Sequence, residues 1–484
     1  MFAGRIATVL FYATMASCLT IASPSLSLEP AQVKNSAGRM KSIRIEAETG
    51  ILTGTVVLND GSGFTGKGYV GKFEAQGSGV RFKITAAAGI YEVKVRYRAS
   101  SEKGYDLVVN GKKASAMFPA SGSIFSSASA GKVELKEGEN EIGIERGWGY
   151  YQIDSLDLMP ASAAIALKTV NPSLSDKSAT PKTRQLMRLL LSKYGSQVFS
   201  GQQNESDIAF IHKTIGASPA ILSSDLIEYS PSRVKHGSRP EGSTERMIAA
   251  AKSGSILSVM WHWNAPKDLL DKKFKNNQGR EIDASWYRGF YTEATTFDLA
   301  RALSDPKSEE YGLLLRDIDA IAMQLKKIQG ADIPVLWRPL HESEGGWFWW
   351  GAKGPDPFKK LWRILYERLT VKHGLHNLIW VYTSGGKKDW YPGDDVVDIV
   401  GTDAYPSDVA DPLSSIWEEL LRQFDGRKML ALTEFGGVPD VERMARFGVR
   451  WAYFASWGGD QGPKKVSEKE LARLYREKRV LNKK

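Results

Sequence analysis

The stretch Pro334-Val335-Leu336-Trp337-Arg338-Pro339-Leu340-His341-Glu342 is a short apolar run that ends in polar and charged residues. Its length and its apolar character are typical of a buried β-strand. A carboxylate just past such a strand is costly to bury unless it lines a cavity. The stretch therefore predicts a buried strand that delivers Glu342 to a cavity.

Similar apolar runs occur on both sides of this stretch and alternate with segments of helical period such as 311–328 and 357–371. Eight strands that alternate with helices predict a (β/α)8 TIM barrel over 181–475, with its active site at the carboxyl ends of the strands. The other expected strands are 197–199, 220–222, 256–260, 378–381, 397–400, 429–432 and 451–454.

The N-terminal part of the chain has a different pattern. Between 42 and 160, apolar and polar residues alternate over short runs that are separated by glycines, as in Tyr91-Glu92-Val93-Lys94-Val95-Arg96-Tyr97. Such short strands predict an all-β sandwich of jelly-roll type. Residues 161–180 are rich in Ala, Ser, Pro and Thr and are expected to be a linker. The chain is thus predicted to be multidomain.

The first residues indicate the compartment. A short positive start, an apolar run over 6–15 and small residues after it predict an export signal over 1–27, and hence a secreted protein. The only cysteine, Cys18, lies in this segment, and lipoprotein anchoring there is the alternative. No later stretch reaches the roughly 20 apolar residues of a membrane-spanning helix, so no membrane span is expected.

The net charge of +10 raises nucleic acid as a partner. Most of the excess positive charge, however, lies in 464–484, which is expected to form a last helix and a frayed end. The positive charge is therefore not a basic stripe along a groove. The glycine-rich stretch 61–68 lies between predicted strands with no helix after it, which argues against a phosphate-binding loop. No nucleic-acid partner is therefore expected.

A second carboxylate follows another predicted barrel strand, in Thr433-Glu434-Phe435-Gly436. Two carboxylates that face each other across a barrel mouth are the minimum equipment for glycoside hydrolysis. Arg338 is either a charge partner of Glu434 or part of a separate salt bridge. Glu344, two residues beyond Glu342, is the rival for the role of the acid.

Aromatic residues gather in or just after the predicted barrel strands four to eight. Indole and phenol rings pack against the apolar faces of sugar rings, so a groove lined by them suits a polysaccharide. Each ring taken singly could equally be a core residue, and Trp337, inside its strand, is expected to be one. The residues are Trp337, Trp347, Trp349, Trp350, Trp380, Trp390, Trp457, Tyr382, Tyr391 and Tyr405.

Three motifs resemble glycoside hydrolase family 26: Trp-Arg-Pro-Leu-His-Glu at 337–342 with Trp347 five residues on, Asp403-Ala404-Tyr405, and Thr433-Glu434-Phe435-Gly436. The resemblance spans roughly 180–470. It implies that Glu342 is the acid/base and Glu434 the nucleophile of a retaining double displacement. The residues that it places at the sugar site are His262, His341, Tyr405 and Trp457, with Trp347 stacking on the leaving-group side.

Members of that family are mainly endo-β-1,4-mannanases, which makes β-mannan or mannooligosaccharides the expected substrate and a monomer the expected state. β-1,3-Xylan and mixed-linkage β-1,3-1,4-glucan are the alternative substrates. A non-catalytic polysaccharide-binding protein is the alternative of another class, although the retention of both carboxylates argues against it. No cofactor is expected for catalysis, because His262 and His341 lack a third zinc ligand in a recognisable spacing.

The N-terminal segment resembles a family 35 carbohydrate-binding module over 42–158, through Glu46-Ala47-Glu48, Val109-Asn110-Gly111 and Ile153-Asp154-Ser155-Leu156 among others. The resemblance implies a structural Ca²⁺ held by Glu46 and Glu48 with Asp154 or Asp157, ligands whose hard oxygens suit calcium. The alternative is that these acids are solvated on a strand face. Sugar binding is expected near Trp148 and Tyr150.

Overall fold

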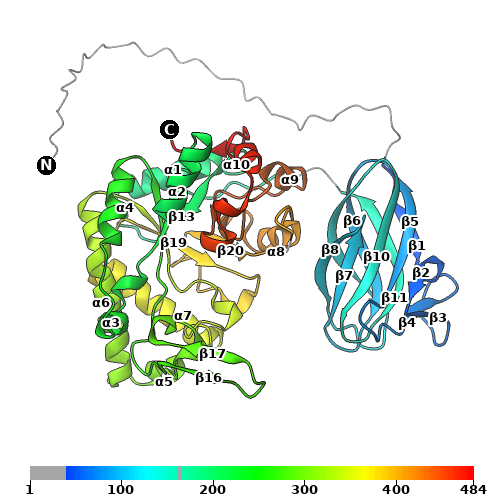
Figure 1. Cartoon of the computed structure of the whole chain (residues 1–484), viewed down its shortest axis with the longest axis horizontal. Coiled ribbons are helices and arrows are strands. Elements are labelled where there is room, and N and C mark those ends of the chain that lie inside the picture. The colour runs from blue at the N-terminus through cyan, green and yellow to red at the C-terminus, as the bar shows by residue number, and fades with distance from the viewer. Residues whose placement is uncertain (1–39, 162–165, 407) are drawn as a thin grey trace, which may run out of the picture.

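The computed structural model describes residues 40–161, 166–406 and 408–484. It contains a β-sandwich followed by a closed barrel of parallel strands (Figure 1). The predicted export signal at 1–27, with Cys18, lies outside the described residues. No helix within the described ranges is both long enough and apolar enough to cross a membrane.

The sandwich consists of two antiparallel sheets, as the alternating pattern predicts. One has the order β3-β4-β11-β6-β9, with β1 paired to β11, and the other has the order β2-β5-β10-β7-β8. The strands are β1 (Ile43–Glu46), β2 (Ile51–Thr53), β3 (Val56–Leu58), β4 (Tyr69–Gly71), β5 (Gly79–Ala86), β6 (Gly89–Arg98), β7 (Lys103–Val109), β8 (Lys112–Phe118), β9 (Ser126–Leu135), β10 (Gly138–Trp148) and β11 (Gln152–Pro160).

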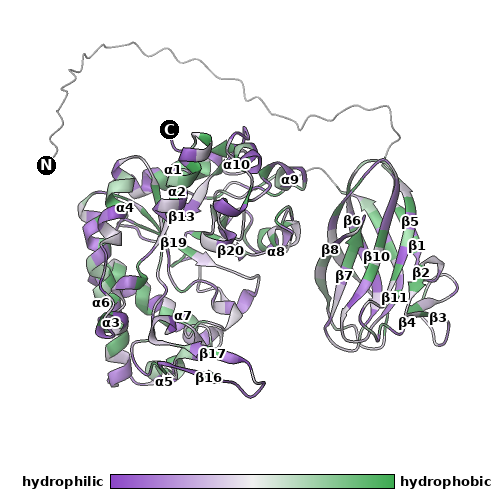
Figure 2. Cartoon of the chain, in the orientation of Figure 1, coloured by the Kyte–Doolittle hydropathy of each residue, from purple (hydrophilic) through white to green (hydrophobic). Residues whose placement is uncertain are grey.

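The sandwich core follows from the period of its strands. Along β6, Tyr91, Val93, Val95 and Tyr97 are buried while the residues between them are partly exposed. Because successive side chains of a strand point to opposite faces, the apolar set meets the facing sheet. Figure 2 shows the same alternation of hydrophobic and hydrophilic residues along the strands.

The second part is a closed eight-stranded barrel, which confirms the predicted TIM barrel. Its strands pair in parallel and in chain order, in the manner of a (β/α)8 fold. They are β13 (Gly201–Gln203), β14 (Ile221–Asp225), β15 (Ile256–Met260), β18 (Val335–Arg338), β19 (Leu378–Thr383), β20 (Ile399–Ala404), β21 (Met429–Phe435) and β22 (Phe454–Ser456).

Helices cover the outside of the barrel. They are α1 (Pro181–Lys193), α2 (Glu205–Ile215), α3 (Pro231–Lys235), α4 (Ser243–Lys252), α5 (Leu299–Ser304), α6 (Glu309–Gly330), α7 (Pro355–Tyr366), α8 (Ser414–Phe424), α9 (Val441–Arg446) and α10 (Glu468–Tyr475). A π-helical turn, Glu367–Lys372, continues α7. A hairpin of β16 (Lys272–Lys275) and β17 (Glu281–Ala284) follows β15.

The first and last barrel strands differ from the prediction. Val198–Phe199 forms β12, which pairs with β23 (Val480–Leu481) outside the barrel, while the first barrel strand is the polar Gly201–Gln203. Hydrophobicity missed this strand because Gln202 is polar although fully buried, and its side-chain amide N–H donates to the carbonyl of Trp457 at 3.0 Å. The expected strand 451–454 is displaced in the same way, to Phe454–Ser456.

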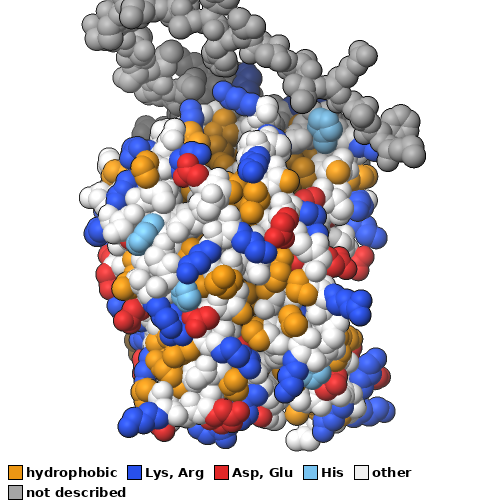
Figure 3. Space-filling view, turned by 90° about the vertical axis from the view of Figure 1, so that its left-hand side faces the viewer, with side chains coloured by type: hydrophobic (Ala, Val, Ile, Leu, Met, Phe, Trp, Pro, Cys, Tyr) orange, Lys and Arg blue, Asp and Glu red, His pale blue; other side chains and the backbone are white. Residues whose placement is uncertain are grey.

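The C-terminal segment is more ordered than expected. After α10 the chain continues into β23, whose Val480 is buried, so the expectation of a frayed end is wrong. The basic residues of this segment are part of a mixed surface. On the face shown in Figure 3, Lys and Arg lie interspersed with Asp and Glu.

Most of the expected linker at 161–180 lies within the described residues, which include 161 and 166–180. Residues 166–180, which the structure describes, pack on the barrel: Leu174 is buried against Ile379 and Val381. The backbone N–H of Ser175 donates to Asp398 at 2.6 Å. Residues 166–180 therefore belong to the barrel.

Candidate active site

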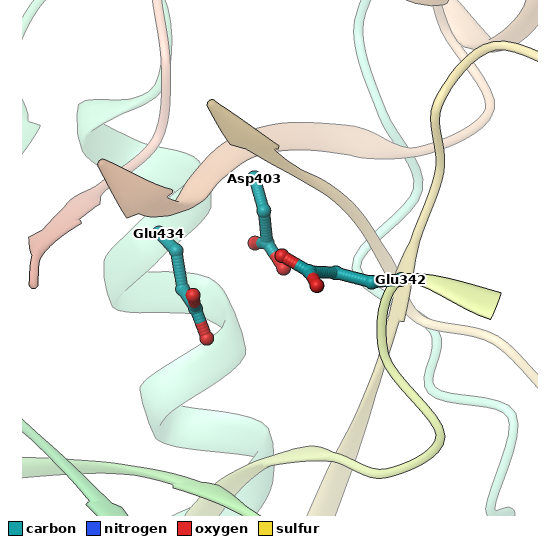
Figure 4. Close-up of side chains that lie close together, drawn as sticks. All are labelled: Glu342, Asp403 and Glu434. Atoms are coloured by element: carbon teal, nitrogen blue, oxygen red, sulfur yellow. The ribbon is translucent and has the colours of Figure 1, made fainter. Parts of the chain in front are cut away.

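Glu342 and Glu434 come from β18 and β21 and meet at the carboxyl-end mouth of the barrel (Figure 4). One carboxylate oxygen of each, together with one of Asp403 from β20, lies within 4.8 Å of the other two. Glu434 is buried and Glu342 is partly buried. Retaining glycosidases hold their two carboxyl groups about 5–5.5 Å apart, and inverting ones about 6.5–9.5 Å. Nearest oxygens this close are compatible with the shorter of the two separations.

A strained turn aims Glu342 into the site. Its backbone lies in the left-handed region with φ of 53°, as does that of Leu340 with φ of 50°. This conformation costs roughly 1–2 kcal/mol for a residue other than glycine. Such strain persists where the surrounding fold imposes it, and it concentrates at functional sites.

Two neighbours hold the carboxylate of Glu434 in place by hydrogen bonds. The Arg338 guanidinium, fully buried, donates to Glu434 Oε1 and, at 2.8 Å, to Asp403 Oδ2. The Tyr405 hydroxyl donates to Glu434 Oε2 at 2.6 Å. Thr433 donates to the other oxygen of Asp403 at 2.6 Å, which orients this carboxylate toward Arg338. Of the two expectations for Arg338, the structure selects the charge partner of Glu434.

Glu342 differs from Glu434 because, among the described residues, no guanidinium donates a hydrogen bond to it. Burial raises the pKa of Glu342, and the charge of Glu434 raises it further. The indole N–H of Trp347 donates to Glu342 Oε2 at 2.8 Å, which opposes this rise by stabilising the charged form. The site thus contains one carboxyl group whose raised pKa favours holding a proton and one that accepts a hydrogen bond from a guanidinium, and these different surroundings suit an acid and a nucleophile.

Two histidines form one wall of the site. His262 follows β15, and its Nε2 lies 3.2 Å from Nε2 of His341. Burial alone would lower the pKa of His262, but the charge and the hydrogen bond of Asp225, 2.5 Å from its Nδ1, together outweigh burial and raise it. Burial and the charge of Arg338 hold the pKa of His341 well below its ordinary value. A protonated His262 can therefore donate to a neutral His341.

The aromatic residues divide into two sets. Trp347 and Tyr405 are half-exposed beside the carboxylates, and the Trp457 ring centroid lies 6.5 Å from that of His262. These three can contact a sugar. The other tryptophans of the predicted groove are core residues, which narrows the expected lining; they are Trp337, Trp349, Trp350, Trp380 and Trp390.

Glu344 is oriented away from this chemistry. Its carboxylate accepts hydrogen bonds from the Tyr382 hydroxyl at 2.9 Å, the Ser384 hydroxyl at 3.0 Å and the backbone N–H of Lys387 at 3.0 Å. A carboxylate engaged in this way has no oxygen left to face Glu434. Glu344 therefore braces the loop after β19.

Asp225 was missed in the sequence. The strand expected at 220–222 continues to Asp225, so this carboxylate ends β14 just as Glu342 and Glu434 follow their own strands. A carboxylate at the end of a strand was therefore visible in the sequence. Two serines precede it, however, so the apolar run ends before Asp225 is reached. Asp403 was quoted only as part of a motif, and the structure places it between Arg338 and Thr433.

The acids of the sandwich form a second cluster. Asp154 is fully buried, and its two oxygens accept hydrogen bonds from the backbone N–H of Thr65 at 2.8 Å and from the Arg96 guanidinium. The Thr65 hydroxyl lies 2.7 Å from Glu46 Oε2 and 2.9 Å from Asp154 Oδ2. Arg44 donates to the other oxygen of Glu46 at 2.8 Å. Glu46 and Asp154 thus share Thr65.

Glu48 completes this cluster, whereas Asp157 does not. Glu48 Oε1 accepts from the backbone N–H of Lys67 at 2.6 Å, but its buried Oε2 has no hydrogen-bond partner. A Cβ on Gly66 would lie 2.3 Å from Glu48 Oε1 and 3.2 Å from an oxygen of Glu46, so the acids press on this backbone. Asp157 instead accepts from Arg44 at 3.0 Å.

The two aromatic residues expected at the module's sugar site have different surroundings. Tyr150 is 65% exposed and lines a cavity of about 650 Å³, together with Lys72, Glu74, Arg98 and Gln152. Trp148 is 50% exposed, and its ring lies under the Lys103 ammonium, 5.8 Å from the ring centroid. Only Tyr150 of the two borders this cavity.

Comparison with known proteins agrees with both parts of the fold. The profile of Glycosyl hydrolase family 26 matches residues 175–484, and that of Carbohydrate binding module (family 35) matches 43–161. A mannan endo-1,4-beta-mannosidase of Thermothelomyces thermophilus is 43% identical over 416 residues, which cover 85% of this chain and 83% of the relative. Mannan endo-1,4-beta-mannosidase A of Piromyces sp is 33% identical, over 87% and 68% of the two chains.

Solved structures give the same result. The Podospora anserina GH26-CBM35 beta-(1,4)-mannanase is 42% identical with a TM-score of 0.66, over 92% of this chain and 98% of its own. A ruminal GH26 endo-beta-1,4-mannanase is 26% identical with a TM-score of 0.68, over 91% and 97%. The chain is therefore a glycoside hydrolase that belongs to family 26 and carries a family 35 carbohydrate-binding module at its N-terminal side.

Proposed function

We propose that this chain is a secreted endo-β-1,4-mannanase that hydrolyses mannan with retention of the anomeric configuration. The observation that carries the proposal is the pair Glu342 and Glu434, whose oxygens lie within 4.8 Å in opposite electrostatic surroundings. The substrate rests on the likeness to relatives named as mannan endo-1,4-beta-mannosidases. Export rests on the apolar start of the chain, with an anchor at Cys18 as the alternative.

In the first step, Glu434 attacks the anomeric carbon while Glu342 gives its proton to the glycosidic oxygen, and the leaving sugar departs with its hydroxyl restored. The product is a glycosyl ester of Glu434. Arg338 and Tyr405 orient the attacking carboxylate by hydrogen bonds and stabilise it again as the leaving group of the second step.

In the second step, Glu342 takes a proton from water, which attacks the same carbon and frees Glu434. The change of role has an electrostatic cause. Esterification removes the negative charge of Glu434, which is one of the two causes that raise the pKa of Glu342. Glu342 is thus a better acid before the ester forms and a better base after it.

The remaining site residues position the sugars. Trp347 presents a half-exposed indole beside the acid, where a leaving-group sugar can stack on it. His262, His341 and Trp457 form the opposite wall, where imidazole and indole N–H groups can meet sugar hydroxyls.

The module is proposed to bind the same class of polymer and to raise the local concentration of the barrel there. Tyr150 and the cavity beside it are the proposed sugar site, and the half-exposed Trp148 is proposed as a separate sugar contact. We also propose a structural Ca²⁺ in the module. The proposed ligands are Glu46, Glu48 and Asp154, which supply hard oxygens, and one buried oxygen of Glu48 lacks a hydrogen-bond donor.

The proposal is tested with the full chain on β-mannan, β-1,3-xylan and lichenan. Reducing-sugar release measures turnover, and NMR of the early products identifies their anomers. We expect turnover of mannan, internal cleavage and β-anomers first. Hydrolysis of xylan or lichenan with no hydrolysis of mannan would overturn the substrate assignment. Early products that are α-anomers would overturn the retaining mechanism. A monomer is expected by light scattering.

A further inference from the structure

The sandwich contacts the barrel through strand β9. Lys132 and Glu134, two residues apart, point to the same face of this strand. The Lys132 ammonium lies 2.7 Å from Glu418 Oε1 on α8 and 3.4 Å from the carbonyl oxygen of Phe447, at the C-terminal end of α9. A helix C-terminus carries partial negative charge and attracts a cation. Lys132 is 17% and Glu418 27% exposed.

Further contacts of opposite charge surround this pair. Glu134 lies 3.3 Å from Arg446 and 3.9 Å from Arg443, both on α9. At the tip of the neighbouring sheet, Lys112 lies 3.3 Å from Asp408, which follows Tyr405 by three residues. Each charge of the sandwich at this surface thus meets an opposite charge of the barrel, which favours one docked orientation over others.

Local contacts accompany the charges, beside a cavity of about 370 Å³ that residues of both domains line. A Cβ on Gly131, whose φ is +89°, would lie 2.8 Å from the Ser415 hydroxyl, so the backbone of β9 lies close to this side chain of α8. Ile90 of β6 packs against the apolar core of the barrel. Exposed ion pairs contribute only about 0–1 kcal/mol each. Here the Lys132 side chain is largely shielded from water, and Ile90 adds an apolar contact, so the interface does not depend on exposed ion pairs alone.

The docked orientation places both sugar sites on one side of the molecule. The catalytic mouth lies at the carboxyl ends of the barrel strands, from which the β16–β17 hairpin extends. The cavity beside Tyr150 lies between the segment after β4 and the start of β11. Figure 1 shows the hairpin and this end of the sandwich on the same side, opposite to the C-terminus.

We propose that β9 docks on α8 and α9 as a fixed interface, which holds the module's sugar cavity and the catalytic cleft on the same side so that both engage one polysaccharide surface. The inference rests on the proposed function for the nature of that surface. The docking itself does not, because it follows from the contacts of Lys132, Glu134 and Lys112.

The test is a charge swap in the full chain, with Lys132→Glu, Glu418→Lys and the double variant. Small-angle scattering should show a larger radius of gyration for each single variant, because two like charges then face each other, and wild-type dimensions for the double variant. Lys83→Glu is the matched control, since it breaks the exposed pair with Glu139 at 3.6 Å inside the sandwich. Single variants with wild-type scattering would overturn the docking.

The functional arm compares hydrolysis of insoluble mannan with that of soluble mannopentaose. The single variants should lose rate several-fold on the insoluble polymer and keep the wild-type rate on the oligosaccharide, and the double variant should recover both. An unchanged ratio, with altered scattering, would overturn the joint engagement. Wild-type protein that cleaves no mannan would instead overturn the proposed function, while the scattering arm would still decide the docking.

Discussion

The barrel and the sandwich each gather three carboxylates and at least one arginine, yet the two clusters are built for different tasks. In the barrel, Arg338 donates hydrogen bonds to Asp403 and Glu434 but not to Glu342. In the sandwich, Arg44 and Arg96 bind Glu46 and Asp154, and a single buried oxygen of Glu48 stays without a donor.

The difference shows what an unpaired carboxylate can do. Glu342 faces Glu434 in a partly buried site, so its charge is opposed by both burial and a second anion, and it favours a proton. Around Glu48 the other carboxylate oxygens accept hydrogen bonds from backbone N–H groups and guanidinium groups. The buried Oε2 of Glu48 has no such donor, so a cation could bind it. The first arrangement suits proton transfer and the second suits a structural metal.

The strongest test of this comparison removes one carboxylate of the barrel. Glu434→Gln should lower kcat by about four orders of magnitude or more, because nucleophile variants lose most of the catalytic effect. Glu342→Gln should lower it by about 10²–10⁴-fold on mannan, and less on an aryl glycoside whose leaving group needs no proton.

Glu344→Gln is the control for these variants, because Glu344 is engaged by Tyr382 and Ser384. It should change kcat far less than Glu342→Gln does on the same substrate. If Glu344→Gln instead showed the larger loss on mannan together with retained activity on the aryl glycoside, the assignment of the acid would be wrong.

A smaller effect is expected from the hydrogen bond to the nucleophile. Tyr405→Phe removes the 2.6 Å bond to Glu434 and keeps the ring. A hydrogen bond to a charged group contributes about 1.5–3 kcal/mol, so kcat should fall roughly 10- to 100-fold, with a smaller change in KM. Steady-state kinetics check this, and a change confined to KM would show that the tyrosine only binds sugar.

The cluster of the sandwich is tested by its response to calcium. Chelated full-length protein should gain thermal stability when Ca²⁺ is added, by about 2.7 kcal/mol at a 100-fold excess over Kd. Asp154→Ala should abolish this gain, and Asp157→Ala should keep it, because Asp157 pairs with Arg44 outside the cluster.

The calcium-induced increment is the quantity to compare, since Asp154→Ala also removes the bond from Arg96 and is less stable without metal. Calorimetric titration gives the number of ions bound. No increment in the wild-type protein would mean that Arg44 and Arg96 alone neutralise these acids.

The smallest predicted effect is a shift of the pH profile. Glu342 must be protonated in the first step, so kcat/KM should fall as the pH rises through its raised pKa. Trp347→Phe removes a hydrogen bond that favours the charged form. The basic limb should therefore move to higher pH, by less than about one unit, and a move to lower pH would contradict this account of Glu342.

The order of domains, the barrel and the two carboxylates could be predicted from the chain alone. Apolar runs and period-2 alternation report burial directly, and Glu342 and Glu434 each follow a long apolar run. Gln202 could not be found in this way, because a buried polar residue is recognisable only once its partner, the Trp457 carbonyl, is in place. Asp225 ends a run that two serines interrupt, and its contact with His262 is visible only in the structure.

The sequence by itself determined the fold class, the family and the residues that can do the chemistry, because these depend on local period and on short motifs. Only the tertiary structure decided which carboxylate has no guanidinium partner and which strand is the first of the barrel. It also decided that β9 contacts α8 and α9. Pairing, desolvation and docking join residues far apart in the chain, and a sequence pattern does not record the distances between them.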